Sequence, residues 1–192
     1  MNPTTPPSGD PRANASKAII RPCREDEATT MLTIINAAAE AYRGVIPSDC
    51  WHEPYMRAAE LQSEIAAGIK FIGYEIDGAL AGVMGIQPVR NVDLIRHAYV
   101  APGYQGRGVG SALMEHLRAR SSRQILVGTW TAATWAIGFY KRHGFQLVPD
   151  DTKTLLLQTY WTISERQIET SVVLALPHLT GDDAEMLVQH SC

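Results

Sequence analysis

The stretch VAPGYQGRGVGSALMEHL, residues 100–117, largely decides how this chain is interpreted. Four glycines, a proline and an arginine separate a strand-like run from a run with helical spacing. The helical stripe consists of Val109, Ala112, Leu113, His116 and Leu117. In a unit of strand, glycine loop and helix, the loop N–H groups and the first free N–H groups of the helix converge on a phosphate. The stretch therefore predicts an anion site built from backbone.

Two well-known phosphate loops do not fit this stretch. A P-loop needs a lysine and then serine or threonine after its last glycine, but Gly110 is followed by Ser111 and Ala112. A dinucleotide fingerprint needs a third glycine where Ser111 stands, and an acid near position 130 that is absent. What remains is QGRGVG, residues 105–110, with the pattern Gln/Arg-x-x-Gly-x-Gly/Ala at the start of a helix. The alternative is a tight turn that binds nothing.

Three further segments support this pattern: IIRP at 19–22 opens a strand, RHAYVAP at 96–102 is the strand before the loop, and FYKRHGF at 139–145 follows at the matching distance. Together with residues 105–110 they resemble the GCN5-related N-acetyltransferase (GNAT) family, and the resemblance covers roughly residues 17–176. It implies an α/β fold with a mixed, mostly antiparallel central sheet that is flanked by helices and splayed at the cofactor site. It also implies an N-acetyltransferase that uses acetyl-CoA as cosubstrate and needs no metal.

The resemblance assigns the cofactor to the glycine loop and the strand before it. Backbone N–H groups of the loop would hold the pyrophosphate, and the pantetheine arm would pair with the strand as an added edge strand. The implied cofactor residues are Tyr99, Val100, Gln105, Gly106, Arg107, Gly108, Val109, Gly110 and Ser111. Arg107 either meets a phosphate or points to solvent. Family members often have an asparagine where this chain has Ala133, so few cofactor contacts are expected from that helix.

Tyr140 is the general acid that the resemblance implies. A phenol titrates near pH 10 and a thiol near 8.5, so the phenol is protonated at pH 7 and available to the departing thiolate. The alternative is a core aromatic residue beside Phe139.

The general base is less clear from the sequence. An amine acceptor with a pKa near 10 must lose a proton before it attacks. By the two-residue period of a strand, Asp93, Ile95, His97 and Tyr99 are expected on one face. His97 is the first candidate, followed by Asp93 and Glu75. The alternatives are a packed core histidine and solvated carboxylates.

The acceptor is expected opposite the cofactor, between residues 43–56 and 160–173. Candidate walls are the aromatic residues Trp51, Tyr55, Trp130, Tyr160 and Trp161, and candidate groups for drawing in a cation are Glu40, Asp49, Glu53 and Glu75. The insert at 150–169 either caps this pocket or forms a homodimer contact. A small-molecule amine is the preferred acceptor. The alternatives are a protein lysine or N-terminus, or a non-catalytic module that senses acyl-CoA or mediates assembly.

Composition indicates one globular domain without nucleic-acid or membrane partners. The chain has 192 residues, 45% of them hydrophobic, a net charge of −3 and dispersed basic residues. Three distant cysteines show no disulfide framework or metal-site spacing, and no signal or membrane segment is visible, so a cytoplasmic protein is expected. Residues 1–16 are predicted to be a disordered tail, 17–177 the acetyltransferase domain and 178–192 a C-terminal tail.

The expected order of elements is a strand, two helices, three strands, helix, strand, helix, strand, an inserted helix and a final strand. A tight turn at Asp77 and Gly78 is predicted to join two of the strands. The helix that contains Tyr140 is expected to have Thr131 as its N-cap and to stop at Gly144.

Overall fold

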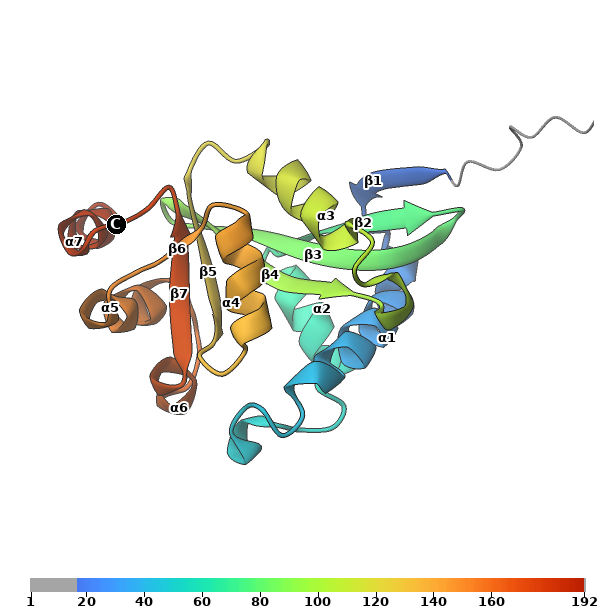
Figure 1. The fold of residues 1–192 in the computed structure, drawn as a ribbon, viewed down its shortest axis with the longest axis horizontal. Coiled ribbons are helices and arrows are strands. Elements are labelled where there is room, and N and C mark those ends of the chain that lie inside the picture. The colour runs from blue at the N-terminus through green and yellow to red at the C-terminus, as the bar shows by residue number, and fades with distance from the viewer. Residues whose placement is uncertain (1–16, 192) are drawn as a thin grey trace, which may run out of the picture.

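The computed structural model describes residues 17–191, so the predicted tail at 1–16 lies outside the described residues. Its centre is a seven-stranded sheet in the order β1-β2-β3-β4-β5-β7-β6 (Figure 1). The strands are β1 Ala18–Pro22, β2 Lys70–Ile76, β3 Ala79–Val89, β4 Val92–Val100, β5 Gln124–Trp130, β6 Gln146–Leu147 and β7 Ser171–Leu176. Neighbouring strands are antiparallel except for β4 and β5, which run parallel. The predicted mixed, mostly antiparallel sheet is confirmed.

Helices cover both faces of the sheet (Figure 1). They are α1 Ala28–Ala39, α2 Ala58–Ala66, α3 Val109–Arg118, α4 Thr134–Arg142, α5 Asp150–Tyr160, α6 Glu165–Glu169 and α7 Gly181–Gln189. The stripe of α3 that includes Val109, Leu113 and Leu117 packs with Tyr140 of α4 on one face. Helices α1 and α2 bury the other face over β2 and β3, and α5 to α7 bury Leu94 and Leu126 farther along the sheet. None of the helices between residues 17 and 191 is long and apolar enough to cross a membrane.

Local signals predicted most of the element order. Asp77 and Gly78 have φ values of 50° and 86° and form the expected turn between β2 and β3. Gly144 follows α4 with a φ of 86°, as its predicted role as a helix stop requires.

The N-cap prediction for Thr131 is wrong, because α4 starts at Thr134 with Ala133 as its N-cap. The Thr131 N–H group donates to the Thr170 carbonyl at 2.9 Å, which ties this residue to the start of β7. Residues 178–192 also contain a helix, α7, where only a tail was expected. Thr180 caps α7 by accepting from the Asp183 N–H group, and Ala184 is fully buried.

The sheet splays between β4 and β5. Their parallel pairing runs from Val92 and Gln124 to Ile95 and Val127 and then stops. In β4, the bulge leaves His97 and Ala98 between the pairs Gly85–Arg96 and Val83–Tyr99, where β3 has only Met84. The last residues of β4 therefore diverge from β5, and the two strands frame the site described next.

Candidate active site

A groove of about 600 Å³ lies beside the end of β4, between α1 on one side and α3 and α4 on the other. Its walls are mostly apolar and include backbone of the glycine loop. The lining residues are Ala38, Ala41, Tyr42, Val83, Met84, Ala98, Tyr99, Val100, Gln105, Gly106, Gly110, Leu113, Trp135, Ala136, Phe139, Tyr140 and Arg142. The groove thus brings Tyr140 together with Tyr99, Val100 and the glycine loop, which lie about 30 to 40 residues before it in the sequence.

The glycine loop has the geometry of an anion cradle. Gly106 and Gly108 have φ values of 72° and 81°, which favour glycine. The first hydrogen bond that enters α3 joins the Ala112 N–H group to the Gly108 carbonyl at 2.9 Å, so the N–H groups of residues 109–111 precede it and are not used within the helix. A Cβ atom added at Gly106 or Gly108 would meet nothing within 4 Å. The loop therefore fits the pyrophosphate of a CoA molecule.

The polar side chains of the loop are engaged locally. The Arg107 guanidinium lies 5.6 Å from the centre of the Tyr104 ring. Gln105 Nε2 donates to the Val100 carbonyl at 3.1 Å, and Ser111 Oγ lies 3.1 Å from His143 Nε2. What the loop offers to an anion is its backbone, which is the chemistry predicted from the glycines.

Sequence reasoning missed the contribution of α4 to this groove. Although Ala133 is fully buried, Trp135, Ala136, Phe139 and Arg142 all line the groove. Their spacing places them along one helical stripe, which is the signal that could have identified them. Arg142 also brings a positive charge to a groove whose expected ligand is an anion.

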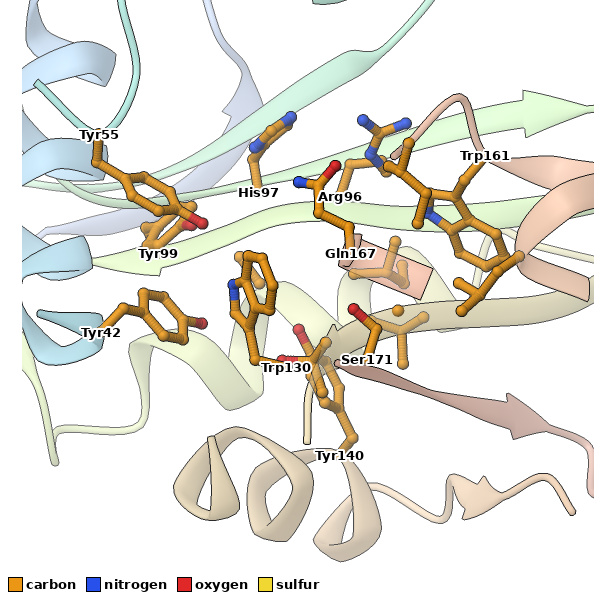
Figure 2. A pocket seen from close by; sticks show the side chains of 17 residues that line it. Tyr42, Tyr55, Arg96, His97, Tyr99, Trp130, Tyr140, Trp161, Gln167 and Ser171 are labelled. Carbon is orange, nitrogen blue, oxygen red and sulfur yellow. The ribbon is translucent and has the colours of Figure 1, made fainter. Parts of the chain in front are cut away.

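A second, smaller cavity of about 190 Å³ lies on the other side of Tyr140 and Tyr99. Polar side chains and aromatic rings from loops, strands and α6 face one another across it (Figure 2). The lining residues are Tyr42, Tyr55, Ile95, Arg96, His97, Ala98, Tyr99, Val127, Gly128, Thr129, Trp130, Tyr140, Leu157, Trp161, Ile163, Gln167 and Ser171. Tyr55, Trp130 and Trp161 thus lie where an acceptor pocket was predicted.

Two predicted aromatic wall residues lie elsewhere. Trp51 packs against Tyr55 at 5.5 Å and lies under the Arg43 guanidinium, outside the cavity lining. The Tyr160 hydroxyl donates to Asn91 Oδ1 at 2.9 Å, in the core beneath α7. Tyr160 therefore points toward α7 and does not line the cavity.

The four acids that were expected to attract a cation do not line the cavity, so this prediction is also wrong. Glu40 and Glu53 both pair with Arg43, and Asp49 pairs with Arg166. Glu75 pairs with Arg21. Among the described residues that line the cavity there is no carboxylate, and its charged groups are Arg96 and, when protonated, His97.

Four residues belong to both cavities: Tyr42, Ala98, Tyr99 and Tyr140. Burial raises the pKa of the Tyr140 phenol, and the neighbouring Tyr42 adds to the effect. Burial likewise raises the pKa of Tyr42 to about 12 and that of Tyr99 well above its usual value. Three protonated phenols therefore stand where the two cavities meet, and Tyr140 has the surroundings of a hydrogen-bond donor at neutral pH.

The predicted shared face of β4 is wrong. The bulge inserts an extra residue at His97, whose φ is 51°, and this reverses the alternation of side chains. Ile95 packs on the α3 side, whereas Tyr99 packs with the α1 and α2 side and His97 stacks on Phe71 of that core. The two candidate bases on β4 therefore lie on opposite faces.

Of the three candidate bases, only His97 lines the acceptor cavity. Asp93 is buried at the far end of β4, where its Oδ2 accepts from Ser121 Oγ at 2.7 Å and it lines another cavity with His116 and Arg120. Glu75 is held by Arg21. The structure thus places Asp93 away from the acceptor cavity, whereas His97 and Tyr140 both line it.

Gly138 lies inside α4, where glycine is less favourable than alanine, and crowding does not explain its presence there. A Cβ atom there would meet only Arg142 Nη1, at 3.5 Å. We therefore expect Gly138→Ala to raise the free energy of unfolding by about 0.5–1 kcal/mol in urea titrations, because alanine loses less backbone entropy in a helix. Affinity for CoA should stay unchanged. The matched control is Gly144→Ala, whose positive φ makes alanine destabilising. Lower stability of Gly138→Ala would contradict this prediction.

Comparison with known proteins agrees with the geometry. Residues 67–147 match the model of the acetyltransferase (GNAT) domain. No curated protein matches the sequence significantly.

Three solved structures show the fold. The PaiA N-acetyltransferase of Thermoplasma acidophilum, solved with coenzyme A, is 17% identical with a TM-score of 0.62 over 83% of this chain and 98% of its own. A GNAT acetyltransferase of Brucella melitensis, solved with acetyl-CoA, is 22% identical with a TM-score of 0.51 over 68% and 83%. The ribosomal-protein-S18-alanine N-acetyltransferase of Escherichia coli is 17% identical with a TM-score of 0.55 over 84% and 94%.

These findings confirm the predicted resemblance. Residues 67–147 resemble the acetyltransferase (GNAT) domain, and the sheet with its flanking helices has the fold of the solved GNAT structures.

Proposed function

We propose that the protein is an acetyl-CoA-dependent N-acetyltransferase that moves an acetyl group to a primary amine of a small molecule by direct transfer in a ternary complex. The observation that supports this most is the meeting of a donor groove and an acceptor cavity at Tyr42, Ala98, Tyr99 and Tyr140. A donor and an acceptor that enter from opposite sides would react at this junction.

The residues of the donor groove fit CoA. Backbone N–H groups of residues 106–111 would hold the pyrophosphate, and Arg142 lines the same groove. The splayed end of β4 leaves Tyr99 and Val100 free of a β5 partner. When bound, acetyl-CoA supplies an activated thioester. Ala38, Met84 and Phe139 give the groove an apolar lining that the pantetheine arm would contact.

Tyr140 and His97 would act on the two protons of the reaction. A C–N bond forms as the C–S bond breaks, the amine loses a proton and the sulfur gains one. The raised pKa keeps the Tyr140 phenol protonated, so it donates a hydrogen bond to the sulfur as negative charge develops. Full transfer from the phenol alone would be uphill, because a thiol is the stronger acid, so CoA leaves as a thiolate that is hydrogen-bonded to Tyr140 and takes its proton from solvent. His97, on the acceptor side, would take the amine proton.

The size and walls of the acceptor cavity support a small molecule. Its volume is about 190 Å³, and Trp130 and Trp161 form part of its wall (Figure 2). At Gly128, a Cβ atom would lie 3.5 Å from the Trp161 indole, so the ring lies directly against β5. A peptide would need an open groove at this place.

We expect Gly128→Val to raise KM for the acceptor about tenfold, since the added methyl groups displace Trp161 from β5. The KM for acetyl-CoA should change little, because Gly128 lines only the acceptor cavity. Gly128→Ala is the matched control and should behave like the wild type, as its single methyl group makes ordinary contact. Steady-state kinetics with both substrates measure the effect. An unchanged acceptor KM in Gly128→Val would contradict this assignment of the cavity.

The proposed function is tested by thiol release from acetyl-CoA across a panel of small amines and peptides, with mass spectrometry of the acetylated products. Turnover of small amines supports the proposal. Turnover of peptides alone would favour a protein acceptor, and tight CoA binding without thiol release from any amine would favour a non-catalytic sensor.

A further inference from the structure

His97 is held in an unusual position by the bulge of β4. Its φ of 51° lies in the left-handed region that a non-glycine residue rarely adopts. The bulge turns the ring toward the face covered by α1 and α2, where it stacks on Phe71 at 5.8 Å. The ring still borders the acceptor cavity, on the wall across from Tyr140 (Figure 2). Backbone and Phe71 thus fix where the imidazole lies.

One nitrogen of this imidazole has a single charged neighbour. His97 Nε2 is buried and makes no hydrogen bond of normal geometry within the described chain. Glu64 Oε2, from α2, lies 3.4 Å away. A small movement of either side chain would bring His97 Nε2 and Glu64 Oε2 within hydrogen-bond distance. Such a bond is favourable, because a buried N–H group without an acceptor is costly.

The Glu64 carboxylate is itself anchored. Arg96 Nη2 donates to both of its oxygens, at 3.1 and 3.0 Å, and Arg96 Nη1 donates to Gln87 Oε1 at 2.9 Å. Burial raises the pKa of Glu64, but His97 and Arg96 outweigh it and lower the pKa overall. Glu64 is therefore an ionised acceptor in a fixed place at neutral pH.

We propose that Glu64 is a positioning residue for His97: it accepts the Nε2–H proton, which leaves the Nδ1 lone pair to take the proton of the acceptor amine. This deepens the proposed function and rests on it for the role of His97. The tautomer of a histidine is set by the hydrogen bond that its other nitrogen makes, so a carboxylate at Nε2 selects the Nε2–H form. The same carboxylate stabilises the imidazolium that forms when Nδ1 accepts a proton.

The titratable and charged groups around His97 come from several elements. Glu64 belongs to α2, Arg96 and Tyr99 to β4, and Tyr42 and Tyr55 to the segments that follow α1. Only Glu64 carries a negative charge at neutral pH, and burial keeps the Tyr42 and Tyr99 phenols neutral. If the Glu64 charge is lost, no other group around His97 should therefore stabilise the imidazolium in its place.

The first test reads the tautomer directly and does not depend on activity. Nitrogen-15 NMR of histidine-labelled full-length protein, with the His97 signals identified by their loss in His97→Gln, should show that neutral His97 carries its proton on Nε2. A proton on Nδ1 would overturn the proposal, because Nδ1 would then have no lone pair for the amine.

The second test is kinetic. Glu64→Gln keeps the shape and removes the charge, and we expect kcat to fall about tenfold, with KM for acetyl-CoA unchanged. The acidic limb of the kcat/KM profile should move to lower pH, because the imidazolium loses its counter-ion. In the double variant Glu64→Gln with His97→Ala, the loss should equal that of His97→Ala alone.

The control is Gln87→Leu, which removes the other Arg96 contact and leaves Glu64 beside His97. It should keep the wild-type pH profile. Additive losses in the double variant, or an acidic limb that Glu64→Gln does not move, would show a purely structural role and overturn the proposal. Absence of turnover by the wild type with every amine would instead refute the proposed function, while the NMR tautomer would still test the Glu64–His97 contact.

Discussion

Replacing Tyr140 by phenylalanine should lower kcat for acetyl transfer by about 10²–10³-fold and change KM for acetyl-CoA by less than about threefold. The phenol is buried where the donor groove and the acceptor cavity meet, and phenylalanine preserves its packing against Phe139 and Phe145 at 5.3 and 5.9 Å. What is lost is one hydrogen-bond donor to the sulfur, an interaction that matters only as the thiolate forms. Thiol release under saturating substrates measures it.

The matched control is Tyr160→Phe, another buried tyrosine that lies away from both cavities. Its hydroxyl bonds Asn91 Oδ1 and the Leu187 carbonyl, so the variant should lose about 1 kcal/mol of unfolding free energy and keep its activity. Because burial raises the pKa of Tyr140, loss of its proton should not reduce the wild-type rate below about pH 10. Full activity of Tyr140→Phe across the pH range would show that the hydroxyl is not the donor.

The glycine loop could be predicted because its chemistry is local. Gly106 and Gly108 adopt the positive φ values that glycine allows, and the helix that follows begins at Val109, where the apolar stripe begins. Backbone N–H groups bind an anion whatever the rest of the fold does. Local sequence was sufficient for this part of the site.

The bulge at His97 could not be read in the same way. Strand periodicity assumes that each residue pairs with one residue of the neighbouring strand. Neither His97 nor Ala98 is a residue type that indicates a bulge. His97 stacks on Phe71 and lies opposite a shift in the β3 register, and neither contact is local in the sequence. This single inserted residue is the reason why Asp93 and His97 lie on opposite faces of β4 and not on the same face, as periodicity predicted.

The acids around the acceptor were misplaced for a similar reason. Asp49 meets Arg166, 117 residues away, and Glu75 meets Arg21, 54 residues away. No local pattern indicates that such a carboxylate is already paired. Glu64 was missed because it looks like an ordinary surface residue of an amphipathic helix, and its meaning depends on Arg96 and His97 from β4.

Replacing Gly108 by valine should weaken CoA binding by about 100-fold in isothermal titration calorimetry. Gly108 has a φ of 81° and stands as the N-cap of α3, so a β-branched residue strains the turn that aims the N–H groups. Its Cβ would also enter the open space above the loop, where a phosphate would lie. Loss of two charge-assisted hydrogen bonds, at roughly 1.5 kcal/mol each, corresponds to this factor.

Two further variants separate the strain at Gly108 from simple bulk. Gly103→Val places the same side chain in open space without a positive φ and should bind CoA like the wild type. Gly108→Ala keeps the strain with little bulk and should lie between the two. If Gly108→Val retained wild-type affinity in a folded protein, the loop would be only a tight turn. The donor groove would then have to hold CoA through Arg142 and the apolar walls of α4 instead.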